Sequence, residues 1–337
     1  MMRAKENRNL NRKIDIWTKA AVLVAVVVSL VVLLAGCESD DDCLNCVDLP
    51  PPVVPTGVHS ISADDLVIVQ WFDISYAPYD DSYNENVVKY VIYSRFYEEG
   101  DYAIPDREFF YNGEVAWDEN YDGDTGLHWF YDFDVENGLQ YEYAVASVNA
   151  AGLESALSYE FVVDAPLPMS PFVNDHYIPV TLHDGNGIQA NMSGFDFAAA
   201  AGNQSNINAG RVDPAAGLYD IEIIFENGIP YALANPTRVV LQDFGVFSSN
   251  GQLIFEGVSW APADGYSQTG KIELVAGHIY VVEIQAPQLH YAKFGVTGTY
   301  TASVDIIWAY QTIVGLPELK APEDLENGSV KPQVVSF

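Results

Sequence analysis

The chain has 337 residues, of which 49% are hydrophobic and 13% aromatic, and it carries a formal net charge of −32 at pH 7. So negative a surface repels phosphates, which excludes nucleic acid as a partner, and it favours divalent cations and cationic ligands. A chain of this length and apolar content can fill two hydrophobic cores, so it is not a low-complexity stalk.

The N-terminus has the form of an export signal. Basic residues come first, namely Arg3, Lys5, Arg8, Arg12, Lys13 and Lys19. An apolar run from Ala20, at the short limit for a membrane span, then ends in Leu34-Ala35-Gly36-Cys37. This ending resembles the lipobox of bacterial type II lipoprotein signals. The resemblance implies that residues 1–36 are removed and that Cys37 becomes a diacylated N-terminus on the membrane, with an uncleaved signal anchor as the alternative.

The same resemblance implies a lipid-anchored protein of the cell envelope. Glu38 follows Cys37, whereas Asp is the usual inner-membrane retention signal there, so we expect the outer membrane in a host with two membranes. Residues 37–54 are acidic and proline-rich, which is typical of a tether. Within it, Cys43 and Cys46 are an even pair in an oxidising compartment, either as a small disulfide loop or as half of an intermolecular metal site.

Proline clusters divide the rest of the chain, because proline disfavours both helix and central strand. They lie within residues 50–55 and 166–171, and they predict folded units over 55–165 and 172–313. The last segment, 314–337, holds prolines among Lys and Glu residues and is expected to be a loosely ordered tail. Neither unit keeps a helical period over three turns. Hydrophobic residues instead recur with a period of two, which predicts an all-β fold.

In the first unit, residues 66–71, 90–94 and 141–145 alternate as strands with one buried face do. Turn signals at Asn137-Gly138 and Ala151-Gly152 and a length near 110 residues favour a small antiparallel sandwich. The motifs along it are Val69-Gln70-Trp71, Tyr90-Val91-Ile92-Tyr93, Tyr131-Asp132, Asn137-Gly138-Leu139-Gln140-Tyr141-Glu142-Tyr143, Val148-Asn149 and Gly152-Leu153-Glu154-Ser155. In this order they resemble a fibronectin type III domain. The resemblance implies that Trp71 packs between the sheets and that Tyr141 makes the tyrosine corner.

The second unit also alternates with a period of two, and it contains Asn227-Gly228 and Asn250-Gly251, which favour tight hairpins. It therefore predicts a second antiparallel β-domain. Its C-terminal half contains Gly277-His278-Ile279-Tyr280-Val281-Val282, Tyr291-Ala292-Lys293-Phe294 and Trp308-Ala309-Tyr310-Gln311. This half resembles the HmuY-like haem-binding lipoproteins, which implies haem as a candidate ligand.

Four of the six histidines lie in the second unit, at His176, His183, His278 and His290. Neutral imidazole is a common axial ligand of haem iron, so these four are the candidate haem ligands. Haem capture would require two of them to converge on one iron. The alternative is that they are surface or turn residues beside strands.

Residues 118–124 place oxygen side chains at alternate positions before and after a glycine, with Asp118, Asn120, Asp122 and Asp124 as candidate calcium ligands. The pattern lacks the carboxylate that an EF-hand carries at its twelfth position, where this chain has Trp129. The alternatives are calcium in a loop of another type and an acidic, solvated connection.

The sequence holds no motif of nucleophilic or metallohydrolase catalysis, so we expect a non-catalytic protein. Aromatic residues gather between residues 72 and 131, either as core or as loop residues that stack on a protein or glycan. The leading hypothesis is a membrane-anchored binding protein that captures haem through its C-terminal domain. The alternatives are a cell-surface adhesion or glycan-binding protein and an accessory subunit of a surface enzyme.

Overall fold

The computed structural model describes residues 51–74, 87–97, 108–160, 162–173, 176–249 and 252–322. All of them belong to one compact unit of the chain, from Pro50 to Phe337. The described residues form an all-β fold in which α2 (Phe197–Ala201) is the single α-helix. The predicted class, a fibronectin type III sandwich followed by a second antiparallel β-domain, is confirmed.

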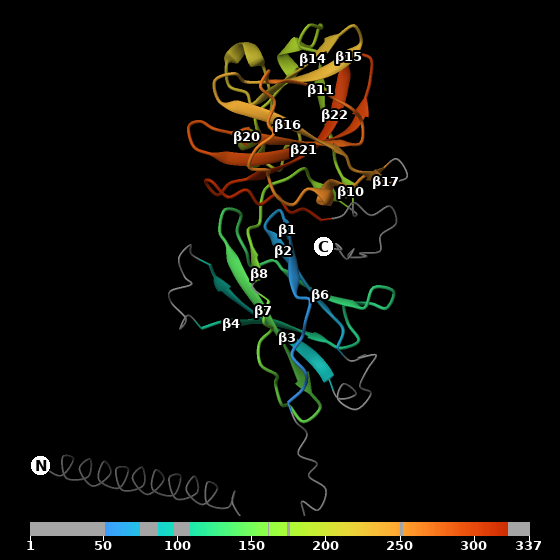
Figure 1. Cartoon of the computed structure of the whole chain (residues 1–337), viewed down its shortest axis with the longest axis vertical. Helices are drawn as coiled ribbons and strands as arrows, with labels where there is room; N and C mark the ends of the chain where they lie inside the picture. Colours follow the sequence, from blue (N-terminus) through green and yellow to red (C-terminus); the bar gives the residue numbers. More distant parts are fainter. Residues whose placement is uncertain are drawn as a thin grey trace, which may run out of the picture. The chain divides into compact units, whose positions relative to one another are not determined.

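The first module is a sandwich of two antiparallel sheets (Figure 1). One sheet has the order β1-β2-β6-β5 and the other the order β4-β3-β7-β8. The strands are β1 (His59–Ala63), β2 (Leu66–Phe72), β3 (Val87–Phe96), β4 (Phe110–Ala116), β5 (Tyr121–Asp122), β6 (Leu127–Asp132), β7 (Tyr141–Asn149) and β8 (Val162–Asp164). The three strands predicted from alternation are β2, β3 and β7.

The core of this module lies between its two sheets, as the period of two requires. Trp71 is fully buried there, together with Tyr90 and Val145. The hydroxyl of Tyr141 accepts a hydrogen bond from the backbone N–H of Glu136 at 2.9 Å. Both structural roles that the fibronectin resemblance implies, for Trp71 and for Tyr141, are therefore confirmed.

The second module contains two five-stranded antiparallel sheets, β11-β22-β21-β20-β16 and β13-β12-β14-β15-β19. The first consists of β11 (Val180–His183), β16 (Val239–Val246), β20 (His278–Ile284), β21 (His290–Thr299) and β22 (Ser303–Gln311). The second consists of β12 (Gly194–Phe195), β13 (Arg211–Val212), β14 (Ile221–Glu226), β15 (Ile229–Ala234) and β19 (Lys271–Glu273). Two small hairpins pair β9 (Phe172–Val173) with β10 (His176–Tyr177) and β17 (Ser248–Ser249) with β18 (Gln252–Leu253). The 3-10 helices are η2 (Ala190–Met192), η3 (Pro214–Ala216) and η4 (Phe255–Gly257).

The sheet that contains β20, β21 and β22 is covered on both faces. On one face, Val304, Ile306 and Trp308 belong to the main core of the second module. On the other face, Ile307 and Ala309 belong to a separate cluster that includes η4. The predicted hairpin at Asn227-Gly228 joins β14 to β15, and both of its residues have positive φ, at 54° and 82°.

The expected tail, residues 314–337, differs in its first part from the prediction. Leu319 and Ala321 are buried, and the N–H of Leu319 donates to the carbonyl of Ser259 at 2.8 Å. The cluster that takes up Leu319 also contains Ala63 from β1. The described end of the chain, up to Pro322, is thus packed because its apolar residues meet a core surface that neither module covers alone. Residues 323–337 lie outside the described part.

Candidate functional site

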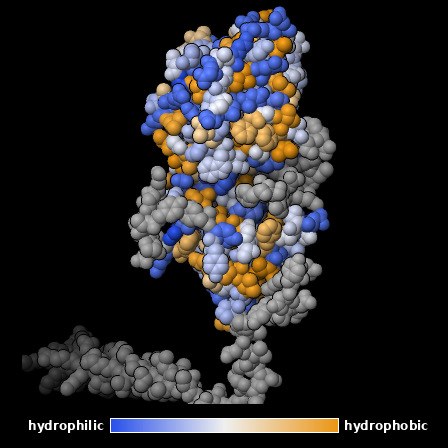
Figure 2. Space-filling model, in the orientation of Figure 1, coloured by the Kyte–Doolittle hydropathy of each residue, from blue (hydrophilic) through white to orange (hydrophobic). Residues whose placement is uncertain are grey.

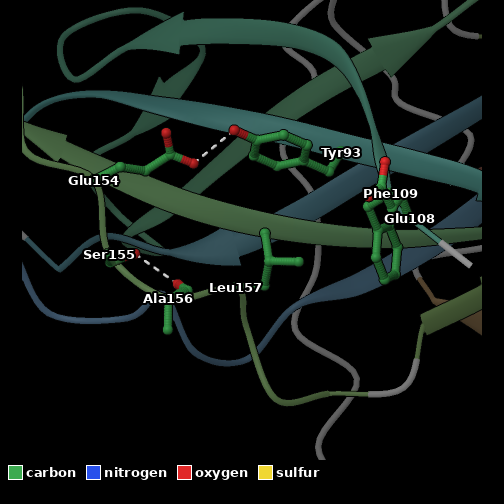
Figure 3. A pocket seen from close by; sticks show the side chains of 7 residues that line it. All are labelled: Tyr93, Glu108, Phe109, Glu154, Ser155, Ala156 and Leu157. Carbon is green, nitrogen blue, oxygen red and sulfur yellow. Dashed lines mark hydrogen bonds between the residues drawn. The ribbon is translucent and has the colours of Figure 1, made fainter. Parts of the chain in front are cut away.

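The first module carries a hollow on the outer side of its sheet β4-β3-β7-β8 (Figure 3). Its volume is about 420 Å³. The lining residues come from β3, from the segment just before β4 and from the segment after β7, and they are Tyr93, Glu108, Phe109, Glu154, Ser155, Ala156 and Leu157. The hollow therefore combines aromatic rings, an apolar floor and two carboxylates, which is the composition of a binding site rather than of a core.

Strand alternation turns Tyr93 toward this hollow. Its neighbours Tyr90 and Ile92 are fully buried between the sheets, so Tyr93 takes the opposite side of β3. Tyr93 pairs with Tyr111 on β4 and with Ala144 on β7. A register shift in the β3–β4 pairing falls between Ile92 and Tyr93 and changes the register of the last pairs of β3 with β4.

A turn after β7 brings the opposite wall of the hollow into place. Gly152 has a φ of 77°, which a glycine adopts without steric cost, and the chain there reverses direction. Glu154 then bridges back to Val148. The N–H of Ser155 donates to the carbonyl of Ser147 at 2.9 Å, which holds the segment alongside β7.

The hydroxyl of Tyr93 donates to Oε1 of Glu154 at 2.6 Å across the hollow. Burial, followed by this hydrogen bond and the charge of Glu154, raises the pKa of Tyr93 to about 12. The phenol therefore keeps its proton at neutral pH and remains a donor to the carboxylate. The bond joins two walls of the hollow and makes Tyr93 and Glu154 a fixed part of its shape.

Beside the hollow, Arg95 lies between an acid and a ring. Its Nε is 2.6 Å from Oε2 of Glu142, and its Cζ is 4.4 Å from the centre of the Phe109 ring. This arrangement is a cation–π contact combined with an ion pair. Glu142 balances the charge of Arg95, and the guanidinium holds Phe109 in position.

Aromatic side chains of this module are more numerous than its core needs. Those that lie exposed among the described residues 72–131 are Phe72, Phe96, Phe110, Tyr111, Trp117 and Tyr121. Phe110 and Tyr111 stand on the edge strand β4, with exposed fractions of 69% and 61%. On the face shown in Figure 2, hydrophobic and hydrophilic residues are interspersed.

The register of the second module keeps three of the candidate haem ligands apart. His278 begins β20, whereas His290 pairs with Ile284 at its other end, about 20 Å away at the rise of a strand. His183 pairs with Ser303 at the start of β22, three strand spacings or about 14 Å from β20. His278 instead contacts Asp243, and His290 contacts the carbonyl of Gln311. The register therefore places these three histidines at separate positions of the sheet, and His176 lies in the separate β9–β10 hairpin.

The predicted calcium loop lies around the short strand β5. Asn120 has a positive φ of 44°, and the two carboxylate oxygens of Asp122 accept bonds from the N–H of Asp124 and the hydroxyl of Thr125, both at 2.9 Å. Within the described ranges, no three or more His, Cys, Asp or Glu side chains are grouped so as to hold a metal ion. Asp118, Asp122 and Asp124 are therefore not brought together as such a group.

Cys37, Cys43 and Cys46, with the signal and most of the tether, lie outside the described residues. Among the residues that are described, no helix is both long and apolar enough to cross a membrane. Lipidation, the disulfide and the address in the envelope stay predictions.

No protein-family model matches the sequence, and no curated protein matches it. Among solved structures, the chain is similar to a DUF4466 family protein from Parabacteroides merdae, with a TM-score of 0.37 and 9% identity over 79% of this chain and 95% of that one. It is also similar to the third fibronectin III domain of human KIAA0343 protein, with a TM-score of 0.25 and 18% identity over 38% of this chain and 94% of that domain. A third is chicken CNTN1 FN1-FN3 domains, with a TM-score of 0.27 and 11% identity over 77% of this chain and 65% of that one.

The sequence patterns do not mark Tyr93 and Glu154 as site residues, although both stand in the fibronectin-like motifs. The two residues are 61 positions apart, and only the strand pairing of β3 with β7 brings them together. A signal was present in the alternation itself, because Tyr93 is an aromatic residue at a position that faces away from the core.

Proposed function

We propose that the chain is an exported, lipid-anchored, non-catalytic binding protein whose fibronectin III-like module holds its ligand in the hollow beside Tyr93 and Phe109. The observation that carries this proposal is the hollow itself, with its rings, its apolar floor and the tyrosine–carboxylate bond that shapes it. Aromatic anchors with polar neighbours dominate the affinity of many interfaces. In this proposal the second module does not hold the ligand and belongs to the same compact unit as the first.

The role of the hollow is tested with arrays of immobilised glycans and peptides probed with the full chain. We expect Phe109→Ala to lower binding to the retained probes by about tenfold or more, because loss of an anchoring ring costs about 2 kcal/mol or more in an interface. The matched control is Phe133→Ala, which removes a ring of the same module with an exposed fraction of 73% that does not line the hollow. If Phe109→Ala and Phe133→Ala bind the retained probes equally well, the hollow is excluded as the binding site.

The anchor rests on the lipobox resemblance at Cys37. We expect metabolic labelling with a radioactive fatty acid to mark the full chain in a bacterial host and Cys37→Ser to abolish the label, because serine lacks the thiol that receives the lipid. Cell fractionation should then find the variant outside the membrane fraction or held by an uncleaved signal. A label that persists in Cys37→Ser would contradict the anchor.

Haem capture is the finer hypothesis for the second module, and it has no pair of converging histidines among His183, His278 and His290 to support it. A haemin titration of the full chain, followed by visible absorbance, tests it directly. If the haemin spectrum does not change in the presence of the chain, haem capture is excluded. Adhesion, glycan binding and a role as an accessory subunit then remain as the candidate functions. A saturable Soret shift would restore it and require a ligand set other than those pairs.

A further inference from the structure

The charged residues that line the described part of the hollow are both acidic. Among the described residues that line it, Glu108 and Glu154 are charged and none is basic. The bond from Tyr93 to Glu154 leaves the charge of the carboxylate in place, because a phenol is a neutral donor. The hollow therefore presents negative charge to a ligand.

Two described basic residues near the hollow form ion pairs of their own. Lys89, which interacts electrostatically with Glu154, lies 2.6 Å from Glu114. Arg95 lies 2.6 Å from Glu142. Each of these two cations thus forms its ion pair with a carboxylate that does not line the hollow. The net charge of −32 on the whole chain adds a long-range attraction for cations.

Besides Tyr93 and Ser155, the other described lining residues are apolar. Ala156 and Leu157 form one side of the hollow and the Phe109 ring another (Figure 3). A ligand that fits must therefore carry an apolar stem and a cationic head. Arginine and lysine side chains have this construction, because a hydrocarbon chain leads to a charged end. The module already uses the same combination next to the hollow, where Arg95 lies on the Phe109 ring and pairs with Glu142.

We propose that the hollow takes an arginine or lysine side chain of a partner protein. The stem packs on Leu157 and Phe109, and the charged head lies beside the carboxylate of Glu154. This inference rests on the proposed function, since it names the chemistry of the ligand for the same hollow. A neutral sugar would use the rings equally well and its hydroxyls would donate to the carboxylates, but it would form no ion pair with them, so the charges favour the basic side chain.

The direct test is a nuclear magnetic resonance titration of the full chain with two matched probes, N-acetyl-arginine amide and N-acetyl-citrulline amide. Citrulline has nearly the shape of arginine without its charge. We expect saturable shifts at Tyr93 and Glu154 with the arginine probe, and binding up to about fivefold weaker with citrulline, because an ion pair at an exposed carboxylate contributes up to about 1 kcal/mol. The affinity for arginine should fall as salt is raised. Equal affinity for the two probes would overturn the proposal.

The variant test separates local from overall charge. Glu154→Gln keeps an acceptor for the Tyr93 hydroxyl but removes the charge, and we expect it to weaken binding of the arginine probe by up to about fivefold. Asp264→Asn removes one exposed charge from the second module and should leave the affinity unchanged. Equal weakening by both variants would show a general electrostatic effect and overturn the site.

A sugar probe separates this inference from the proposed function. Binding of methyl glucoside at the hollow, independent of salt and lost in Phe109→Ala, would overturn the basic ligand and keep the proposed function. If none of the probes binds and Phe109→Ala binds the arrays as the wild type does, both the basic ligand and the proposed function are overturned.

Discussion

Replacing Lys320 by methionine is expected to lower the free energy of unfolding by about 3–5 kcal/mol at pH 8, because it leaves two buried carboxylates without their cation. The Lys320 ammonium lies 2.8 Å from Oε1 of Glu318 and 3.3 Å from Oδ2 of Asp164. Asp164 ends β8 of the first module and is fully buried, and Glu318 is 1% exposed. The hydroxyl of Ser62 donates to the other oxygen of Asp164, but it supplies no charge.

The effect of this variant should depend on pH. Burial, and then the charge of Asp164, raise the pKa of Glu318 to about 7 even with Lys320 present. Below this value Glu318 is protonated in the native state and no longer opposes Asp164, so the loss in Lys320→Met should become smaller toward pH 5. The control is the double variant Glu318→Gln, Lys320→Met, which removes one charge of each sign and should recover part of the loss. Urea denaturation at pH 8 and pH 5 measures both, and a loss under about 1 kcal/mol at pH 8 would contradict the expected ion cluster.

Replacing Lys293 by alanine is expected to destabilise the chain by about 3–5 kcal/mol at pH 9, and by less at pH 6. Lys293 stands on β21 with no exposed surface. Its ammonium donates to the carbonyls of Phe255 at 2.7 Å and Val258 at 2.8 Å, and it lies 4.3 Å from the centre of the Phe255 ring. The lysine thus ties η4 to the sheet, and alanine would leave both carbonyls without this donor and a cavity in place of the stem.

The pH dependence follows from the burial of the amine. Burial lowers the pKa of Lys293 to about 7, far below its ordinary value of 10.5. Between these two values the unfolded chain binds a proton that the native chain does not, so the stability of the wild type rises with pH across this window. Below pH 7 the ammonium is charged in both states and the native state carries the full cost of burying it. Alanine removes that cost, so the loss at pH 6 should be smaller by more than about 1 kcal/mol.

Lys293→Met is the companion variant, because it keeps an apolar stem of similar length and removes only the amine. We expect its loss at pH 9 to be smaller than that of the alanine variant, since methionine fills most of the space. The free energy of unfolding is measured by denaturant titration at pH 6 and pH 9 for the wild type and each variant. The difference between variant and wild type at each pH cancels the contributions of the other ionisable groups. An alanine loss that is equal at pH 6 and pH 9 would contradict a buried amine with a lowered pKa.

Local alternation was enough to predict much of the first module. Val69 and Trp71 point to the core because side chains two apart on a strand share a face, and one face of each sheet is buried. The turn at Asn227-Gly228 was equally predictable, since few residues other than glycine and asparagine adopt positive φ at low cost. These features depend on residues that are neighbours in the chain.

Local sequence patterns do not determine the positions of the histidines or the packing of the C-terminal segment. Whether His183, His278 and His290 converge depends on the register of four paired strands, and no local pattern encodes that register. The segment 315–322 has the composition of a tail, yet Leu319 is buried because a surface made of both modules accepts it. The composition of a segment is a property of that segment alone, whereas its burial depends on which other parts of the chain it packs against.

The sequence by itself determined the all-β class, the sandwich of the first module and the buried faces of β2, β3 and β7, because hydrophobic periodicity is a local property that the backbone geometry translates directly into buried faces. The tertiary structure alone decided the candidate site. Tyr93 and Glu154 are separated by 61 positions and meet only when β3 pairs with β7 and the turn at Gly152 returns the chain. The hollow, the ion cluster at Lys320 and the buried amine of Lys293 all arise in this way, since contacts between distant segments are set by packing and strand pairing rather than by the residues on either side.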